Sequence, residues 1–227
     1  MADRISIGVG IQARISSRRF KNKVFAKLWN GLTVLESCIE QAKQLRTGLN
    51  MSGALCSLGL LVPKTQESFF KPYASEHQMW LITGPEHDVL RRYLSYQKEG
   101  GFDYIVRLTS DCPVFSPLLA DQIIRKTLLT RSEFGIIKTP DPYPDGLDVE
   151  VIEKGLLKRI ERFCQKNKAK SYKEHVTLCL KKDPILTHRR CELDFMVEFN
   201  GLPKMSIDTN DDLSRLQSLR GQVFWIH

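Results

Sequence analysis

The 227-residue sequence contains no run of about 18 or more apolar residues, which is the length that a membrane-spanning helix needs. Its longest apolar run, near residues 54–62, is interrupted by Ser57 and Gly59. The first ten residues, MADRISIGVG, have no extended apolar region followed by small residues, so they do not resemble a secretory signal peptide. We therefore expect no membrane span and a cytoplasmic location.

The cysteines are scattered, and no CxxC pair occurs among them. A structural zinc site needs clustered ligands, and a disulfide framework is unusual in a chain of this size without a secretion signal. We therefore expect reduced, mostly buried thiols. These are Cys38, Cys56, Cys112, Cys164, Cys179 and Cys191.

The sequence also lacks internal repeats, low-complexity tracts and a Pro/Gly/Ser-rich linker, so we expect one domain over residues 1–227. Apolar, β-branched runs predict strands at residues 5–11, 54–62, 79–82 and 104–108. Helical spacing predicts helices at residues 33–45, 67–76, 87–97 and 117–129. In the first helix, Thr33 and Glu36 form a candidate capping box. This alternation predicts an α/β fold of three layers with a mixed, mostly parallel sheet.

The pattern changes after about residue 134. Further strands are predicted at residues 134–139, 147–152 and 205–208, with an extended segment at 189–199. Helices are predicted at residues 153–165, 171–181 and 211–219. We expect this part to add strands to the same sheet and to form a small lobe over one edge.

Positive charge is in excess, with a formal net charge of +8 and a pI near 9.2. Such a balance favours anionic partners, which include nucleic acid, anionic lipid and small phosphorylated substrates. Aromatic residues are not interleaved with the basic clusters as a stacking platform for nucleic acid requires. A basic nucleic-acid-binding protein therefore remains an alternative, but a less favoured one.

The segment after the first predicted strand reads QARISSRR and leads on to Lys23. Backbone N–H groups, hydroxyls and fixed positive charges in one loop suit a triphosphate, because arginine binds phosphate in a bidentate manner and lysine acts as a point charge. Neither the Walker A pattern nor GxGxxG occurs, so the loop is neither a P-loop nor a Rossmann fingerprint.

Two carboxylates follow other predicted strands. Asp111 lies in RLTSDCP and Asp208 in SIDTNDD. Ligands of open α/β sheets bind at the carboxyl ends of strands, and Mg²⁺ is held by one or two carboxylates together with substrate phosphates. Each aspartate alone also fits a turn or a helix cap, and we interpret Asp211 and Asp212 as capping residues.

These segments, in this order, resemble the cytidylyltransferase family that makes CMP-activated acidic sugars, including 3-deoxy-manno-octulosonate and sialic acids. The resemblance is greatest to the branch of spore-coat polysaccharide biosynthesis cytidylyltransferases. The matching stretches are GIQARISSRRFKNKVFAKL, TGPEHDVLRRY, DYIVRLTSDCPVFSP, YPDGLDVEV, YKEHVT and MSIDTNDDL, which together span nearly the whole chain.

The resemblance implies a GT-A-like nucleotide-diphospho-sugar transferase fold, usually homodimeric, with a lobe or dimerisation region within about residues 134–200. It implies Mg²⁺ as cofactor, and CTP and an acidic sugar of the nonulosonate or octulosonate type as substrates. The implied catalytic residues are Arg14, Lys23, Asp111 and Asp208, with the two aspartates on the metal. The implied nucleotide-binding residues are Gln12, Ala13, Arg14, Ser17, Arg19, Lys23, Arg107, Thr109 and Ser110. The implied sugar-binding residues are Tyr143, Asp145, Gly146, Asp148, Glu150, Glu174 and His175.

The chain departs from the family pattern at two places. Lys21 and Asn22 stand where the phosphate loop usually has Pro-Gly, and Ser110 stands where a glycine usually precedes the aspartate. Asn22 still tolerates a positive φ. An inactive relative and a GT-A glycosyltransferase that consumes a nucleotide sugar therefore stay open as alternatives, although the DxD triplet of such a glycosyltransferase is missing near the middle of the chain.

Overall fold

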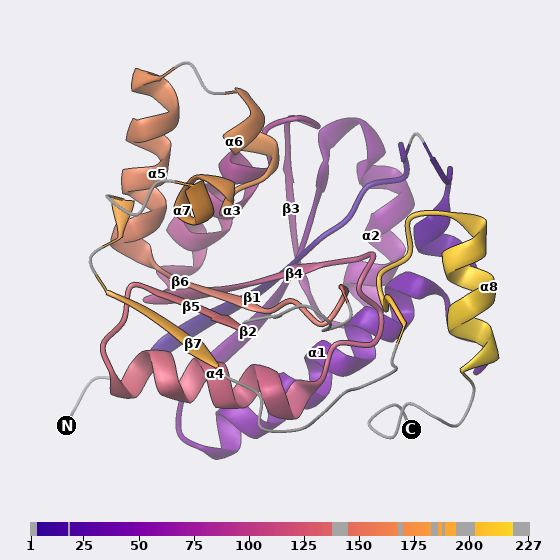
Figure 1. The fold of residues 1–227 in the computed structure, drawn as a ribbon, viewed down its shortest axis with the longest axis horizontal. Coiled ribbons are helices and arrows are strands. Elements are labelled where there is room, and N and C mark those ends of the chain that lie inside the picture. Colours follow the sequence, from indigo (N-terminus) through magenta and orange to yellow (C-terminus); the bar gives the residue numbers. More distant parts are fainter. Residues whose placement is uncertain are drawn as a thin grey trace.

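A central sheet between two layers of helices organises the chain in the computed structural model (Figure 1). The structure describes residues 4–17, 19–137, 145–167, 170–182, 186–187, 189–193 and 203–219. Its strands are β1 (Ser6–Gln12), β2 (Leu55–Pro63), β3 (Trp80–Gly84), β4 (Tyr104–Thr109), β5 (Phe134–Ile137), β6 (Glu150–Glu153) and β7 (Arg190–Leu193).

The strands lie in the order β3-β2-β1-β4-β6-β5-β7. β1 pairs in parallel with β2 and β4, and β2 pairs in parallel with β3. β6 runs antiparallel to both β4 and β5, and β5 pairs in parallel with β7. The prediction of a mixed, mostly parallel sheet in a three-layer α/β fold is confirmed.

Helices cover both faces of the sheet. They are α1 (Val34–Met51), α2 (Glu67–Glu76), α3 (Val89–Gly100), α4 (Pro117–Leu129), α5 (Lys154–Lys166), α6 (Lys170–Glu174), α7 (Leu178–Lys182) and α8 (Asn210–Ser218), with 3-10 turns η1 (Lys23–Phe25) and η2 (Lys64–Gln66). Buried side chains of α1, α2 and α4 share one core cluster, and those of α3 and α5 share another on the opposite face. In Figure 1, α1 and α4 accordingly lie below the sheet and α3 and α5 above it.

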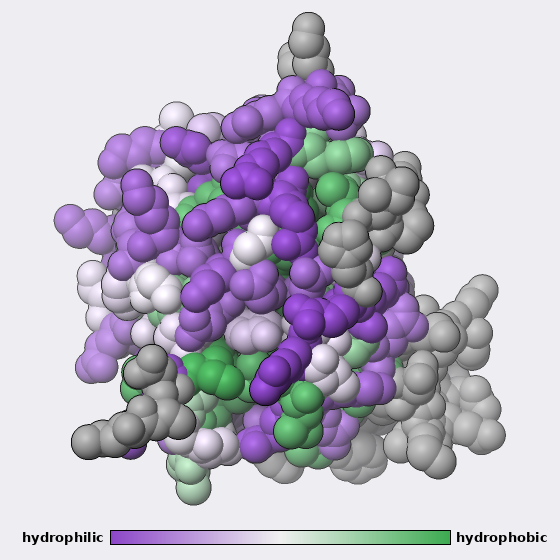
Figure 2. Space-filling view, turned by 90° about the vertical axis from the view of Figure 1, so that its left-hand side faces the viewer, coloured by the Kyte–Doolittle hydropathy of each residue, from purple (hydrophilic) through white to green (hydrophobic). Residues whose placement is uncertain are grey.

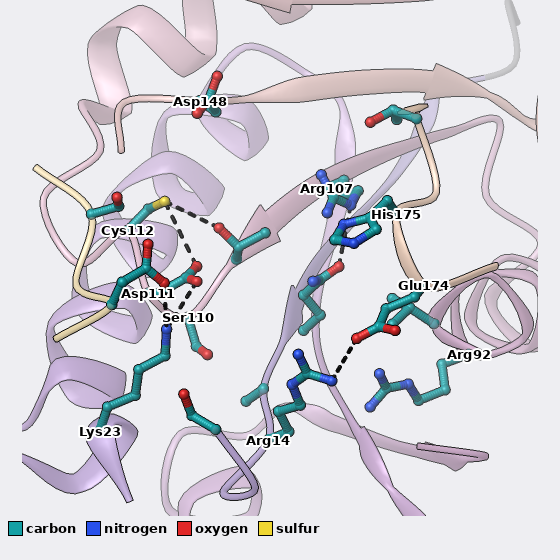
Figure 3. Close-up of a pocket in the computed structure, with 18 of the residues that line it drawn as sticks. Arg14, Lys23, Arg92, Arg107, Ser110, Asp111, Cys112, Asp148, Glu174 and His175 are labelled. Atoms are coloured by element: carbon teal, nitrogen blue, oxygen red, sulfur yellow. Dashed lines mark hydrogen bonds and ion pairs between the residues drawn. The ribbon is translucent and has the colours of Figure 1, made fainter. Parts of the chain in front are cut away.

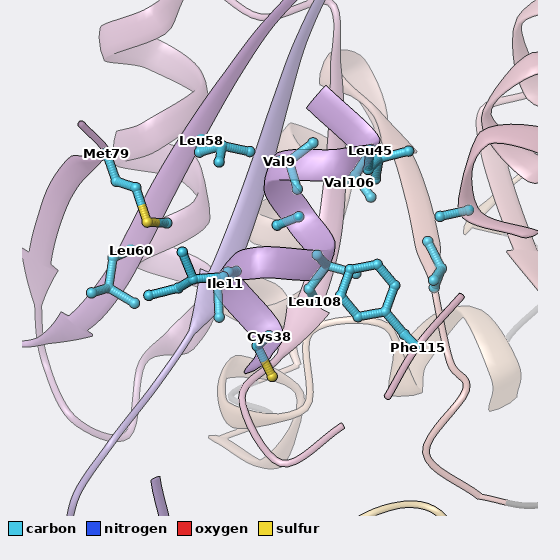
Figure 4. Packing of buried hydrophobic residues seen from close by; sticks show 14 of the residues in the cluster. Val9, Ile11, Cys38, Leu45, Leu58, Leu60, Met79, Val106, Leu108 and Phe115 are labelled. Atoms are coloured by element: carbon cyan, nitrogen blue, oxygen red, sulfur yellow. The ribbon is translucent and has the colours of Figure 1, made fainter. Parts of the chain in front are cut away.

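Successive residues of β1 face opposite sides of the sheet, so this one strand contacts both helical layers. Val9 and Ile11 point towards α1 and pack with residues of β2 and β4 (Figure 4). Gly10 points the other way, and a Cβ there would lie 2.9 Å from the ring of Tyr93. The Tyr93 hydroxyl donates to the carbonyls of Gly10 (3.0 Å) and Leu108 (3.2 Å), so α3 is held against the ends of β1 and β4.

The outer surface of α5 is hydrophilic, because its apolar residues face inward. Leu156, Leu157, Ile160 and Cys164 are buried against the sheet. The side of the molecule on which α5 lies is mainly hydrophilic (Figure 2). Among the described residues, no helix is long and apolar enough to cross a membrane.

Local signals predicted several boundaries. The Thr33 side chain accepts from the Glu36 N–H and the Glu36 side chain accepts from the Thr33 N–H, which confirms the capping box of α1. This helix runs on to Met51, beyond the predicted end, because Leu45 and Leu49 continue its buried stripe. All six cysteines are free and five are buried, as expected.

Two predictions of secondary structure were wrong. Residues 171–181 form two short helices rather than one, because Val176 turns into the core and the Thr177 hydroxyl donates to Glu150. Residues 205–208 form no strand. Met205 and Ile207 instead pack into a third apolar cluster with Leu28, Val114, Leu147 and Leu216, and this cluster fixes the segment beside the other loops of the sheet edge.

Candidate active site

A cavity of about 1080 Å³ opens at the carboxyl ends of β1 and β4. It brings together the predicted residues Gln12, Ala13, Arg14, Ser17, Arg19, Lys23, Arg107, Thr109, Ser110, Asp111, Asp145, Asp148, Glu150, Glu174, His175 and Asp208. Tyr143 lies outside the described residues. Gly146 does not line the cavity. Side chains from positions far apart in the sequence therefore meet where parallel-sheet proteins bind ligands.

Lys23 lies between the two predicted metal carboxylates. Its ammonium nitrogen is 3.1 Å from Asp111 Oδ2 and 3.5 Å from Asp208 Oδ1, and it donates to the Ile207 carbonyl at 2.7 Å. The Lys23 side chain is only 10% exposed, so water screens these charges poorly. Figure 3 shows Lys23 and Asp111 at one end of the cavity. The Ile207 N–H also donates to the Asp111 carbonyl at 2.8 Å, which joins the two aspartate segments directly.

Asp208 is surrounded by basic side chains. It contacts Arg19 (2.9 Å) and Lys204 (2.8 Å) besides Lys23. Burial alone raises the pKa of Asp208, but the hydrogen bond from Lys204 and the nearby positive charges outweigh burial and lower it. Asp208 is therefore a carboxylate at neutral pH, which is the state that binds a cation.

Asp212 holds the Asp208 segment in place. Its Oδ2 accepts from the backbone N–H groups of Asp208 (2.9 Å) and Thr209 (3.0 Å), and Thr209 completes a capping box at the start of α8. The prediction that Asp212 caps the helix is confirmed. Asp211 is exposed in the first turn of α8.

Replacing Asp212 by alanine is expected to cost about 1–2 kcal/mol of stability at pH 7, because both N–H partners lose their acceptor. Burial alone raises the pKa of Asp212, but the hydrogen bonds from Arg215 and the backbone outweigh burial. The net effect is a pKa well below 3.8, the usual value of an aspartate. The contribution is therefore present above pH 3.8 and is lost as the pH falls below it. Urea unfolding at pH 7 and pH 3 should show a difference between wild type and Asp212→Ala that shrinks in acid. Asp211→Ala is the matched control, and an equal loss in both variants would contradict the assignment.

Arg14 and Glu174 form an ion pair in the lining of the cavity. Arg14 Nη1 donates to Glu174 Oε1 at 2.8 Å, which ties the loop after β1 to α6 across 160 residues of sequence (Figure 3). Glu174 also lies 3.8 Å from His87 Nδ1. Burial raises the pKa of Glu174, but the hydrogen bond and charge of Arg14 outweigh burial and lower it. A predicted phosphate-binding arginine is thus already paired with a predicted sugar-binding carboxylate.

Arg107 and Glu150 form a buried ion pair between β4 and β6. Arg107 Nη1 lies 2.6 Å from Glu150 Oε2, and Arg107 Nε donates to Gln12 Oε1 at 3.2 Å. The Thr177 hydroxyl donates to Glu150 as well. Burial lowers the pKa of Arg107, but the charge of Glu150 and the Tyr93 ring hydroxyl more than compensate, so the pKa is raised. This network fixes polar groups of three strands along the cavity floor.

Gly146 has a supporting place beside the cavity. Its φ is +109°, and a Cβ there would lie 2.2 Å from the Ser206 backbone nitrogen, so only glycine fits. The carboxylate of the preceding Asp145 accepts from the Ser206 hydroxyl (2.6 Å). The main-chain carbonyl of Asp145 accepts from the backbone N–H groups of Met205 and Ser206. Asp145 and Gly146 therefore position the segment that carries Asp208.

Several cavity residues were not predicted from the sequence. They are Ser16, Glu86, His87, Val89, Arg92, Cys112, Thr177, Leu178 and Ser206. Burial raises the pKa of Cys112 well above its usual value, which favours the protonated thiol over the nucleophilic thiolate. Ser16 lies in the loop after β1 and Ser206 in the segment before α8. The others belong to the β3–α3 loop, α3 and the segments around α6 and α7, whose proximity depends on the tertiary fold.

The carboxylate pair suits a hard divalent cation that also binds substrate phosphates. Asp111 and Asp208 converge on one positive charge, and no cluster of three or more His, Cys, Asp or Glu ligands occurs in the described part of the chain. Mg²⁺ is typically held by one or two carboxylates while phosphates and water complete its shell. The residues present therefore fit such an ion together with a nucleotide, rather than a closed protein cage.

Comparison with known proteins gives consistent results. The sequence model of the family described as Cytidylyltransferase matches residues 9–225. The chain is 25% identical over 219 residues to the spore coat polysaccharide biosynthesis protein SpsF of Bacillus subtilis, covering 92% of this chain and 84% of that protein.

Solved structures share the fold. A cytidylyltransferase from Leptospira borgpetersenii superposes with a TM-score of 0.82 at 22% identity, over 96% of this chain and 88% of that one. CMP:2-keto-3-deoxy-manno-octonic acid synthetase complexed with CTP superposes with a TM-score of 0.61 at 12% identity, over 96% and 99% of the two chains. The GT-A-like nucleotidyltransferase fold is confirmed.

Proposed function

Because the chain belongs to the cytidylyltransferase family, we propose that it transfers CMP from CTP to a hydroxyl group of an acidic sugar and releases pyrophosphate. The observation that carries the proposal is the convergence of Asp111, Asp208 and Lys23 at one end of the cavity. Two carboxylates that can share a divalent cation, beside a lysine and Arg19, are what a triphosphate needs.

In the proposed reaction, a sugar hydroxyl oxygen forms a bond to the α-phosphorus of CTP. The bond from that phosphorus to the oxygen bridging to the β-phosphate breaks, and pyrophosphate leaves with the electron pair. The hydroxyl proton passes to solvent or to a nearby base, for which His175 is the candidate at the cavity wall. Little covalent chemistry is required of the protein, so positioning and charge neutralisation supply most of the acceleration.

Each part of the site has a proposed role in this reaction. Asp111 and Asp208 would hold Mg²⁺, which when bound neutralises phosphate charge and orients the nucleotide. Lys23 and Arg19 would bind the departing pyrophosphate once they release the aspartates. Arg14 would bind phosphate after exchanging its partner Glu174. Asp148, Glu150 and His175 would face the sugar hydroxyls.

The acidic sugar is proposed from three observations. One structural neighbour is a synthetase of CMP:2-keto-3-deoxy-manno-octonic acid, an acidic sugar, and one sequence relative is named for polysaccharide biosynthesis. The chain itself has a net charge of +8, which attracts anionic substrates.

The test is pyrophosphate release by purified protein with Mg²⁺, using CTP, UTP, GTP, ATP and dTTP in turn against acidic and neutral sugars. We expect release with CTP and an acidic sugar, and none without the sugar. Release with another nucleotide would overturn the choice of CTP, and release with neutral sugars alone would overturn the acidic acceptor. Glycosyl transfer from a supplied nucleotide sugar would favour the glycosyltransferase alternative, and salt-dependent gel shifts without nucleotide binding would favour a nucleic-acid-binding protein.

A further inference from the structure

Arg92 is a buried cation at the cavity wall without a carboxylate partner among the described residues. The whole residue is 2% exposed. Within the part of the chain that the structure describes, the only hydrogen bond of the Arg92 side chain runs from Nη1 to the Leu61 carbonyl at 3.2 Å, and the buried Nε has no acceptor there. Guanidinium groups buried in proteins are normally paired, because leaving such a charge and its donors unsatisfied is costly.

The surrounding chain is built to hold Arg92 in this place. A Cβ on Gly84, at the end of β3, would lie 2.8 Å from Cγ of Arg92, so the glycine makes room for the arginine stem. Arg92 is on α3, one turn after Val89, which also lines the cavity. Its neighbour Arg91 points outward, is 63% exposed and contacts Glu161. Of the two adjacent arginines, Arg91 therefore faces solvent and Arg92 faces the cavity.

The charges near Arg92 leave it available to a ligand. Arg14 lies beside it and is paired with Glu174, as Figure 3 shows. Burial lowers the pKa of Arg92 to about 10, an effect that the charge of Arg14 reinforces and those of Glu86 and Asp88 oppose. The side chain is therefore still a cation at neutral pH. Asp88 is engaged as the N-cap of α3 and with Lys173, and the Glu86 side chain contacts Ser16.

We propose that Arg92 is a nucleotide-binding residue whose guanidinium donates to two adjacent acceptor atoms of CTP. A guanidinium presents parallel N–H donors and no acceptor, which matches either two oxygens of one phosphate or the neighbouring O2 and N3 acceptors of cytosine. Uracil presents an N3–H donor at the second position, so only the cytosine contact would discriminate between the bases. The assignment rests on the proposed use of CTP and adds a residue to that site.

The test compares Arg92→Met, Arg92→Lys and the control Arg91→Met for thermal stability and for binding of CTP, UTP and tripolyphosphate by calorimetry. We expect Arg92→Met to melt no lower than wild type without ligand, because an unpaired buried charge is removed, and to bind CTP about 10- to 100-fold more weakly. Arg92→Lys should fold but recover little affinity, since an ammonium lacks the two-pronged geometry. Arg91→Met should bind like wild type.

Comparing CTP, UTP and tripolyphosphate distinguishes a contact of Arg92 with cytosine from a contact with phosphate. Weaker binding of CTP alone would identify the cytosine edge, and equally weaker binding of CTP, UTP and tripolyphosphate would identify a phosphate. Wild-type affinity for CTP in Arg92→Met, full recovery in Arg92→Lys, or a loss of affinity that accompanies a lower melting temperature would overturn the proposal. If wild type itself does not bind CTP, the proposed function fails instead, which is a distinguishable result.

Discussion

Asp111→Asn is expected to reduce turnover by more than about 100-fold while leaving the melting temperature nearly unchanged. Loss of a group that merely orients a metal ligand costs 10- to 100-fold, so removal of the charge from a proposed ligand should cost more. Asparagine keeps the size of the side chain and an oxygen that accepts from Lys23, which lies 3.1 Å from Asp111 Oδ2. The measurement is pyrophosphate release as a function of Mg²⁺ concentration.

Asp103→Asn is the control, because Asp103 lies just before β4, at the opposite end of the strand, and pairs with Lys154 at 2.8 Å. We expect that variant to keep the turnover and Mg²⁺ dependence of the wild type. If Asp111→Asn retained wild-type turnover with an unchanged Mg²⁺ requirement, Asp111 would not be a metal ligand.

Lys23→Met is expected to lower both stability and turnover, and to make stability depend on Mg²⁺. Without the ammonium, Asp111 and Asp208 face each other across the site with one counter-charge fewer, which we estimate to cost about 2 kcal/mol. In a chain of this size that corresponds to a fall of about 4–8 °C in melting temperature. Mg²⁺ should then restore part of the loss, because it takes the place of the ammonium between the carboxylates.

The stability readout of Lys23→Met is a melting curve with and without millimolar MgCl₂, in the absence of nucleotide. Wild type should gain less from Mg²⁺, since the ion has to displace Lys23 first. Lys27→Met is the matched control, because Lys27 is 64% exposed and contacts only the capping residue Glu36 at 3.6 Å among the described acidic side chains. An equal gain from Mg²⁺ in wild type and Lys23→Met would contradict a shared cation site.

Much of the fold was predictable because local patterns and tertiary packing agree. The apolar run of β1 and the capping box at Thr33 each have one physical interpretation, and both are confirmed. The strand predicted at residues 205–208 was wrong because its apolar residues serve a loop cluster instead of a sheet. The helix predicted at residues 171–181 was wrong because Thr177 is drawn inward to Glu150.

The composition of the site was predictable, but its internal pairing was not. Polar residues after β1 and β4 had to meet at one sheet edge, and the resemblance supplied the order of the segments. The pairing of Arg14 with Glu174 joins positions 160 residues apart, which no local pattern encodes. Arg91 and Arg92 are adjacent and chemically identical. Only the packing of α3 determines that Arg91 forms an exposed ion pair and that Arg92 is a buried donor. The homodimer and the lobe within about residues 134–200 stay predictions.

The most direct measurement follows the α-phosphorus of CTP by phosphorus NMR in a reaction with Mg²⁺ and 2-keto-3-deoxy-manno-octonic acid or a sialic acid. We predict that the α-phosphorus signal moves from the triphosphate to a sugar-linked phosphodiester, in step with an equal amount of pyrophosphate. Phosphorus recovered as free CMP, or CTP that neither binds nor reacts while a nucleotide sugar is consumed, would contradict nucleotidyl transfer to an acidic sugar.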